Sequence, residues 1–289
     1  MTATQPTAGQ HRASAGSPAR SARWLRNKTL VAGLALLAVI AGMVACAPLL
    51  AARNPDQQDL LHVFAGPSAA HPLGTDDLGR DIWSRLLYAG RADLVIGFAA
   101  VLAPFILGSA LGLLAGYLGG WVDAVIMRVL DIVVAFPFYV LVIAVVFALG
   151  AGVGSIFIAI TAVGWVSYTR IVRGQVLVAK RLGYAQAARA AGLSAPRIML
   201  RHLAPNVLGQ AVVYAMSDIV LTILAVVTLG YLGLGVQPPA PEWGAMMQAG
   251  EPYLGLHPAL ATAPGVAVVL TGLALSMIGD GLAAEFAAS

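Results

Sequence analysis

Six long apolar segments constrain the fold of this chain more than any other feature of its sequence. A helix needs about 20 apolar residues to cross the hydrocarbon layer of a membrane. Only 10% of the 289 residues are charged and 59% are hydrophobic, whereas soluble domains carry about 25% charged residues. The chain is therefore predicted to be an all-α integral membrane protein with six transmembrane helices. The predicted helices cover residues 30–50, 94–117, 124–149, 153–172, 207–235 and 259–279.

The distribution of charge predicts on which side of the membrane each connecting segment lies. Cytoplasmic loops carry the excess of Lys and Arg. Residues 1–28 contain five cations and no acid, and residues 170–206 contain seven cations and no acid. Residues 53–93 contain four arginines and six aspartates, so this segment is predicted outside, as is the acidic segment 236–258. Four spans separate the two basic segments, so both termini are expected in the cytoplasm.

The chain is predicted to divide into consecutive parts. Residues 1–28 are expected to be a disordered basic tail, because small and polar residues dominate them. Residues 29–91 hold the first transmembrane helix and an outer loop. Residues 92–283 hold the transmembrane core, which includes a cytoplasmic loop at 173–206, and residues 284–289 form a short tail.

The basic loop at 173–206 is too polar to cross the membrane, and its pattern predicts a helical hairpin. Gly192 can adopt the left-handed conformation that ends a helix. Ser194 can cap a second helix with Pro196 in its first turn, and Pro205 is expected to break that helix before the fifth span. Helical spacing gathers four residues on one face of the first helix, where a partner could approach closely. They are Tyr184, Ala187, Ala188 and Ala191.

Three explanations compete for this hairpin. Its cations could simply orient the chain and contact anionic lipid. Its alanines, turn glycine and following serine also resemble a DNA-binding helix-turn-helix. A recognition helix must be free to enter a groove, however, and both ends of this hairpin join membrane spans, so a nucleic-acid partner is not expected. The third explanation is a docking element for a cytosolic motor protein.

Several stretches resemble one family of membrane proteins. Residues 186–192 read Gln-Ala-Ala-Arg-Ala-Ala-Gly, and they resemble the EAA loop of ATP-binding-cassette (ABC) importer permeases. Residues 71–91, HPLGTDDLGRDIWSRLLYAGR, resemble the hallmark of the dipeptide, oligopeptide and nickel permeases, in particular of their second, C-type subunit. The similarity runs from about Trp24 to Leu282. Further matching stretches are residues 116–137, 231–247 and 278–282.

The resemblance implies a type I ABC importer transmembrane domain in the inner membrane of a prokaryote. It implies three kinds of partner besides membrane lipid: a homologous second permease subunit, two ATP-binding-cassette ATPase subunits and an extracytoplasmic solute-binding protein. It also assigns the contact with the ATPase to residues of the basic hairpin. These residues are Tyr184, Gln186, Ala187, Ala188, Arg189, Gly192, Arg197 and Arg201.

Three positions depart from the family pattern. Gln186 replaces the glutamate of the EAA loop, which removes a charge but keeps hydrogen-bonding capacity. Val226 stands where the family often has an acidic residue. The sequence DGLAAEFAAS replaces the usual DGLRDALDP at the C-terminal end, so a cytoplasmic contact there is in question.

The sequence contains no phosphate-binding loop of the form GxxxxGK[ST]. Any ATP and Mg²⁺ that drive transport are therefore expected in partner ATPase subunits, and no cofactor is expected in this chain. No Ser/His/Asp, Cys/His or paired-carboxylate arrangement points to catalysis, so the chain is not expected to be an enzyme.

The resemblance implies that the acidic outer loop meets the solute-binding protein, and its residue spacing does not predict a metal site. Its aspartates fit no EF-hand spacing and alternate with arginines. Thr75 or Asp76 is expected to cap a short amphipathic helix that bears Ile82, Trp83, Leu86 and Leu87. The residues predicted to contact the binding protein are Asp76, Asp77, Arg80, Asp81, Glu242 and Trp243.

Charged residues inside spans are costly and commonly face a pathway or a partner. Arg128 and Asp131 are three residues apart, so they are predicted to pair on one helix face. Asp218 has no partner in its own predicted helix and is the stronger candidate for the substrate pathway, with Asp131 as the second candidate. A structural role in pairing with the second permease remains an alternative for Asp218.

Two patterns within the spans predict helix packing. Gly108, Gly112, Gly116 and Gly120 are spaced by four, so they should form a smooth face for close contact with another helix. Three prolines inside predicted spans are expected to kink them. These prolines are Pro104, Pro137 and Pro264.

Peptides are the first substrate class that the resemblance implies. Nickel or a metal chelate is the alternative, since the same permease pattern serves both. An ion-coupled secondary transporter is a further alternative, but it would need more intramembrane ionisable residues than Asp131 and Asp218 supply.

Overall fold

The computed structural model describes residues 27–51 and 53–287 of the chain. Most of the predicted N-terminal tail, residues 1–26, lies outside this part. All regular secondary structure in the described residues is helical, apart from an isolated bridge between Thr75 and Asp81. The main helices are α2 (Lys28–Ala45), α4 (Ile82–Leu118), α5 (Gly120–Val134), α6 (Phe138–Leu149), α7 (Val153–Ala179), α10 (Ala204–Tyr231) and α12 (Ala259–Ala287). Shorter elements are α3 (Ala47–Leu50), α8 (Gly183–Ala190), α9 (Ala195–Arg197), the π-helix η1 (Ile198–Leu203), α11 (Trp243–Gly250) and the 3₁₀-helix η2 (Glu251–Tyr253).

The helices agree with the predicted membrane spans, with one correction. Five helical segments in the described residues are long and apolar enough to cross a membrane, and the pair α5 and α6 makes a sixth only if a bent pair counts as one span. The two helices meet at 88°, where one straight span over 124–149 was predicted. Pro137 has no N–H to continue the helix and disfavours helical geometry at Phe136, so α5 ends before it. By contrast, α4 and α12 continue through Pro104 and Pro264.

Helix α4 is longer than predicted at its outer end. The segment expected to form a separate amphipathic helix is the first two turns of α4, and Ile82 and Leu87 in it are buried. Asp81, and not Thr75 or Asp76, is the N-cap: its carboxylate accepts hydrogen bonds from the Ser84 backbone N–H at 2.8 Å and the Ser84 hydroxyl at 2.6 Å.

Three of the four regularly spaced glycines lie in the most extensive helix contact among the described residues, between α4 and α7. A Cβ on Gly108, Gly112 or Gly116 would lie within 3.0 Å of α7 atoms, including the carbonyl oxygens of Trp165 and Thr169. The predicted packing face is therefore confirmed at these positions. Gly120 is not part of it, because it begins α5 with φ +54° and has no neighbour within 4 Å.

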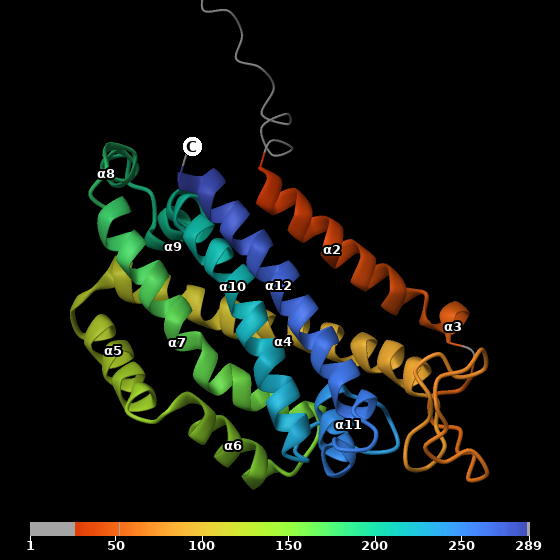
Figure 1. Ribbon diagram of the computed structural model, residues 1–289. Coiled ribbons are helices and arrows are strands. Elements are labelled where there is room, and N and C mark those ends of the chain that lie inside the picture. Colours follow the sequence, from red (N-terminus) through yellow and green to blue (C-terminus); the bar gives the residue numbers. More distant parts are fainter. Residues whose placement is uncertain (1–26, 52, 288–289) are drawn as a thin grey trace, which may run out of the picture.

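The remaining helices place the connecting segments at two opposite ends of the molecule (Figure 1). Helix α2 packs along α12, and α10 packs against α4, α7 and α12. Helix α8, the start of α2 and the end of α12 lie at one end, called the inner end below. The loop 53–81 and α11 lie at the other, outer end. Helix α12 continues to Ala287, through most of the segment predicted as a short tail.

Candidate functional site

The inner hairpin consists of α8, a turn and α9, as predicted. Helix α8 ends in a Schellman motif: Gly192 has φ +73°, its N–H donates to Arg189 O at 2.9 Å, and the Leu193 N–H donates to Ala188 O at 3.2 Å. Ser194 is the N-cap residue of α9, although its side chain makes no capping hydrogen bond. The turn is therefore fixed by the backbone of Gly192.

The exposed face of α8 differs from the predicted one at Ala188. Ala185 and Ala188 are buried in the main apolar cluster. They are three residues apart and therefore lie on the same face of α8, the face that packs against the rest of the molecule. Ala188 consequently packs inward and is not on the exposed face. The other residues predicted to contact an ATPase are exposed: Tyr184, Gln186, Ala187, Arg189, Gly192, Arg197 and Arg201.

Two cations, one in the hairpin and one at the end of α7, contact the inner end of α4. The Arg189 guanidinium lies 5.0 Å from the centre of the Tyr117 ring, a cation–π contact. Lys180 Nζ, at the end of α7, donates to Gly116 O at 2.6 Å. Gln186 Nε2 donates to Arg181 O at 2.9 Å within the hairpin. A displacement of α8 would therefore act directly on the inner end of α4.

A bidentate ion pair ties two further helices together beside these contacts. Arg173 of α7 donates to both carboxylate oxygens of Asp123 in α5, with Nε–Oδ1 and Nη2–Oδ2 distances of 2.5 and 2.6 Å. The ends of α4, α5, α7 and α8 are thus linked by polar contacts. The sequence analysis did not identify this pair, because its members are 50 residues apart.

Pro205 does not separate the hairpin from the fifth span, contrary to the prediction. Helix α9, η1 and α10 follow one another without a break, and Ala195–Tyr231 forms one continuous helical segment. Pro205 occupies the first turn of α10. The π-helix η1 directly precedes α10. Its wider turn changes the backbone hydrogen-bonding pattern just before the proline without ending the helix. The second arm of the hairpin is therefore a rigid extension of α10.

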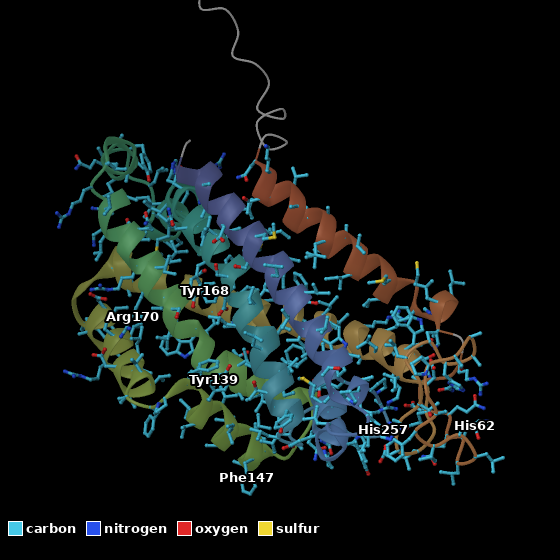
Figure 2. The ribbon with its side chains drawn as sticks, in the orientation of Figure 1. His62, Tyr139, Phe147, Tyr168, Arg170 and His257 are labelled. Carbon is cyan, nitrogen blue, oxygen red and sulfur yellow. The ribbon has the colours of Figure 1, made fainter. Side chains whose placement is uncertain are left out.

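Asp218 of α10 forms a hydrogen bond with another helix. The hydroxyl of Tyr168 in α7 donates to Asp218 Oδ2 at 2.7 Å. The Tyr168 ring is fully buried and contacts Phe105 and Tyr214 edge-on, with ring centres 5.5 and 5.0 Å away. Asp218 itself is only partly buried. Figure 2 shows Tyr168 between the two ends of the helical array.

Asp131 pairs with a different arginine from the one predicted. Its carboxylate lies 3.8 Å from Nη2 of Arg170 in α7, and both side chains are about half exposed, at 56% and 49%. Arg128 makes no ion pair among the described residues. The prediction from spacing within one helix was wrong because it could not include α7. Arg170 lies on the α5 side of the molecule (Figure 2).

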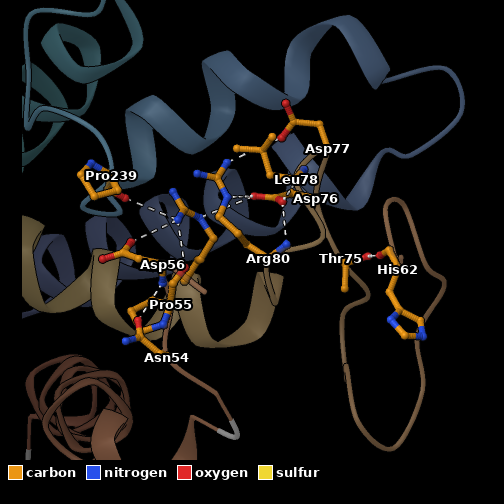
Figure 3. Close-up of polar contacts among 11 residues, drawn as sticks. Asn54, Pro55, Asp56, His62, Thr75, Asp76, Asp77, Leu78, Arg80 and Pro239 are labelled. Atoms are coloured by element: carbon orange, nitrogen blue, oxygen red, sulfur yellow. Dashed lines mark hydrogen bonds and ion pairs between the residues drawn. The ribbon is translucent and has the colours of Figure 1, made fainter. Parts of the chain in front are cut away.

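A network of arginines and aspartates holds the outer loop in place (Figure 3). The Asp76 carboxylate accepts from Arg80 Nε at 2.7 Å and from the Arg80 and Leu78 N–H groups at 2.9 and 3.0 Å. Arg85 Nη1 donates to Pro55 O at 3.0 Å and lies 3.5 Å from both the Asp56 carboxylate and Pro239 O. This network joins the loop after α3 to the segment before α11.

Most of the predicted contacts with a binding protein are therefore buried. Asp76 and Asp81 are 7% and 1% exposed, and Glu242 and Trp243 are 0% and 1% exposed. They stabilise the outer end and cannot present a surface to a partner, whereas Asp77 and Arg80 are partly exposed. The reason is local: each buried acid accepts hydrogen bonds from the backbone at the start of a helix or within a turn.

Glu242 caps α11, and the sequence analysis did not identify this role. Its two carboxylate oxygens accept from the Gly244 and Ala245 N–H groups at 2.8 and 2.9 Å. Burial raises the pKa of the Glu242 carboxyl because water no longer solvates its charge, and the two backbone donors act in the opposite direction. An acid directly before the apolar stretch of α11 was the signal that could have identified this cap.

Three cavities lie at or near the outer end. One of about 140 Å³ is bordered by Asp77, Arg80 and Gln248 among other residues. A second, of about 220 Å³, is almost entirely apolar and lies between α2, α4, α11 and α12. A third, of about 180 Å³, lies between the loop 65–75 and the start of α12. Among the described residues, no group of three or more His, Cys, Asp or Glu side chains could hold a metal ion.

Family comparisons identify the fold and the class. The family described as "Binding-protein-dependent transport system inner membrane component" matches residues 108–288. The family "N-terminal TM domain of oligopeptide transport permease C" matches residues 17–67. A chain of the inward-facing MetNI methionine ABC transporter has the same fold, with a TM-score of 0.56, 19% identity, and coverage of 68% of this chain and 93% of that chain.

Curated relatives are similar over most of their length. The glutathione transport system permease protein GsiD of Pectobacterium atrosepticum is 40% identical over 90% of this chain and 87% of its own. The dipeptide transport system permease protein DppC of Alkalihalophilus pseudofirmus is 38% identical, with 89% and 84% covered. The probable D,D-dipeptide permease DdpC of Escherichia coli is 39% identical, with 83% and 80% covered. The chain, with its bent span and inner hairpin, belongs to the family of binding-protein-dependent transport system inner membrane components.

Proposed function

We propose that this chain is one permease subunit of an ATP-driven importer of peptides. The observation that carries the proposal is the similarity of 38–40% over most of the chain to relatives named for dipeptide, D,D-dipeptide and glutathione transport. Glutathione is itself a small peptide, so these names share one substrate chemistry. None of these names supports the alternative of nickel or chelate transport.

The proposed partners are a second permease, two ATPase subunits and a solute-binding protein. The exposed side of α8 supports an ATPase contact, because it is basic, small and rigidly capped by Gly192. The contacts of Arg189 and Lys180 with α4 offer a route by which movement of the ATPase would reach a spanning helix. The exposed polar pair of Asp131 and Arg170 is costly against lipid and suits a face turned to the second permease or to the pathway.

The proposed mechanism is alternating access driven from the inner hairpin. When the ATPase subunits close on nucleotide, α8 moves, and α4 and α10 move with it, since α9 and η1 continue into α10. The helices thus alternate between two arrangements, and each arrangement opens the pathway to a different side of the membrane. Because η1 and α10 form a continuous helical segment, force applied at the hairpin reaches the outer end of α10 without an intervening flexible loop.

Uptake measurements test the proposal directly. A strain that lacks this chain should lose uptake of labelled dipeptides, glutathione or longer peptides, and the intact gene should restore it. Labelled nickel is measured in parallel and should enter equally in both strains. If uptake of every peptide is unchanged by the deletion, the proposed substrate class is wrong.

Asp218 is proposed to bind the amino group of a peptide in the pathway. Its Oδ2 already accepts from Tyr168, and a carboxylate has capacity for further donors. Asp218→Asn should lower uptake of peptides with a free amino terminus about tenfold, a loss of about 1.4 kcal/mol. Uptake of N-acetylated peptides should change little. Tyr168→Phe keeps the carboxylate and is the matched control, and an equal loss for both kinds of peptide would contradict the role.

A further inference from the structure

Two buried carboxyl groups lie against each other at the outer end, and the transport mechanism above does not use them. Asp93 of α4 and Glu242 before α11 are both 0% exposed. Glu242 directly precedes Trp243, whose backbone N–H donates to Asp93, so the two carboxyl groups are neighbours. No Lys, Arg or His among the described residues forms an ion pair with either of them. The pair therefore lacks the cation that normally compensates buried acids.

The hydrogen bonds of the pair leave one oxygen without a donor. Asp93 Oδ2 accepts from the Trp243 N–H at 2.9 Å. Both oxygens of Glu242 accept from backbone N–H groups of α11. Asp93 Oδ1 is buried and has no hydrogen-bond partner among the described residues. Two ionised carboxylates cannot bond to each other, because both only accept, so a bond from Asp93 to Glu242 requires a proton.

The surroundings leave the pair little freedom to separate. A Cβ on Gly230 of α10 would overlap the Glu242 carboxylate, and a Cβ on Gly244 of α11 would lie 2.0 Å from Val227 O. The Trp243 ring is also enclosed, and its indole N–H donates to Leu86 O at 3.1 Å. Two ionised carboxylates in such a site would repel each other without solvent to screen them. A single shared proton removes this repulsion and satisfies Asp93 Oδ1.

We propose that Asp93 and Glu242 form a proton-binding site that fastens α11 to α4. The proton is on Asp93 Oδ1 and is donated to the Glu242 carboxylate, while Glu242 remains the cap of α11. Since α11 packs between α10 and α12, loss of the proton would loosen the junction of these helices with α4. This inference is independent of the peptide substrate, because it rests only on the described side chains.

The sign of the pH effect follows from proton counting. The folded chain binds one proton that an ordinary carboxyl of the unfolded chain releases at neutral pH. Stability therefore falls as pH rises, because the folded state binds more protons than the unfolded state. The contacts of the pair are with backbone N–H groups of α11 and with Gly230 of α10, none of which titrates in this range, so the part of the pH dependence that Asp93→Asn removes belongs to the pair.

Infrared spectroscopy of the purified full-length chain at neutral pH tests the site. The wild-type chain should show the carbonyl band of a buried protonated carboxylic acid, and Asp93→Asn should lose it. Asp131→Asn makes the same chemical change at an exposed aspartate in another helix, so it should leave the band unchanged. If the band remains in Asp93→Asn, or is absent from the wild type, the proposal is overturned.

Thermal unfolding provides an independent measurement on the same proteins. The melting temperature of the wild type should decrease from mildly acidic to mildly alkaline pH. Asp93→Asn should flatten this dependence, because the amide N–H donates to Glu242 at every pH. If Asp93→Asn does not fold, Asp93→Ser serves instead, since it removes one carboxyl and with it the shared proton, and leaves both oxygens of Glu242 to the backbone of α11. The same pH dependence in the wild type and in the folded variant would contradict the site.

Discussion

Gly192→Val is expected to abolish transport while the chain still folds and inserts into the membrane. Gly192 has φ +73°, a conformation that costs most residues about 1–2 kcal/mol and costs a β-branched residue more. No atom lies within 4 Å of the position of an added Cβ, so the effect is backbone strain and not a steric clash. The strain would disrupt the Schellman motif and change the direction in which α8 leaves the turn.

The variant should lose the coupling between ATP hydrolysis and transport, but it should still be present in the membrane. Gly192 itself is exposed and belongs to none of the apolar clusters, so membrane levels of the variant should match those of the wild type. Uptake should fall to background, and ATP hydrolysis by the assembled transporter should no longer respond to substrate. Asn tolerates the left-handed conformation, so Gly192→Asn is the matched control and should retain most activity. Normal uptake by Gly192→Val would refute the coupling role of the hairpin.

Gly112→Leu is expected to prevent stable folding of the chain. A Cβ at this position would lie 2.8 Å from both Thr169 O and the Val172 Cβ, so α4 and α7 could not keep their present separation. Added volume in a packed interface costs about 1–3 kcal/mol, and more where backbone atoms block it. Since this is the most extensive helix contact among the described residues, the variant should be degraded or should melt far below the wild type.

Gly174→Ala is the control for that substitution. Gly174 lies in α7, in the other helix of the same contact, but nothing lies within 4 Å of its added Cβ. Alanine favours a helix over glycine by about 1 kcal/mol, so this variant should be as stable as the wild type or more stable. The comparison is made by thermal unfolding in detergent. Equal stability of Gly112→Leu and Gly174→Ala would show that the α4–α7 contact is not as tight as described.

Features set by a few neighbouring residues were predictable from the sequence. The apolar spans follow from length and composition, and the left-handed turn at Gly192 follows from a glycine at the end of an alanine-rich helix. The glycine face on α4 was also predictable, because regular spacing places residues on one side of a helix whatever it packs against. In each case the information lies within one element.

Features that depend on two elements were predicted poorly. Asp131 meets Arg170, and Asp218 meets Tyr168, across helices that the sequence places 39 and 50 residues apart. The inward face of α8 is occupied by Ala185 and Ala188 because the helix rests on the ends of other helices. Alanines occur on several sides of α8, so the sequence alone does not show which side packs against the other helices.

The polar outer residues show a different limit. Glu242 and Asp81 were predicted to face a binding protein because the resemblance implies such a contact at the outer end. In the structure each carboxylate accepts a hydrogen bond from a backbone N–H group at the start of a helix. Pro205 shows the same limit for backbone geometry, since the π-helical η1 allows a proline to follow without ending the helix.

Reconstitution in vesicles tests the central claim most directly, which is that this chain moves peptides only when a separate ATPase drives it through the inner hairpin. The complete transporter, with its second permease, ATPase subunits and binding protein, should accumulate labelled peptide when ATP is supplied on the hairpin side. Vesicles that contain the permease subunits alone should accumulate none. Peptide accumulation by the permease subunits without the ATPase would contradict this account.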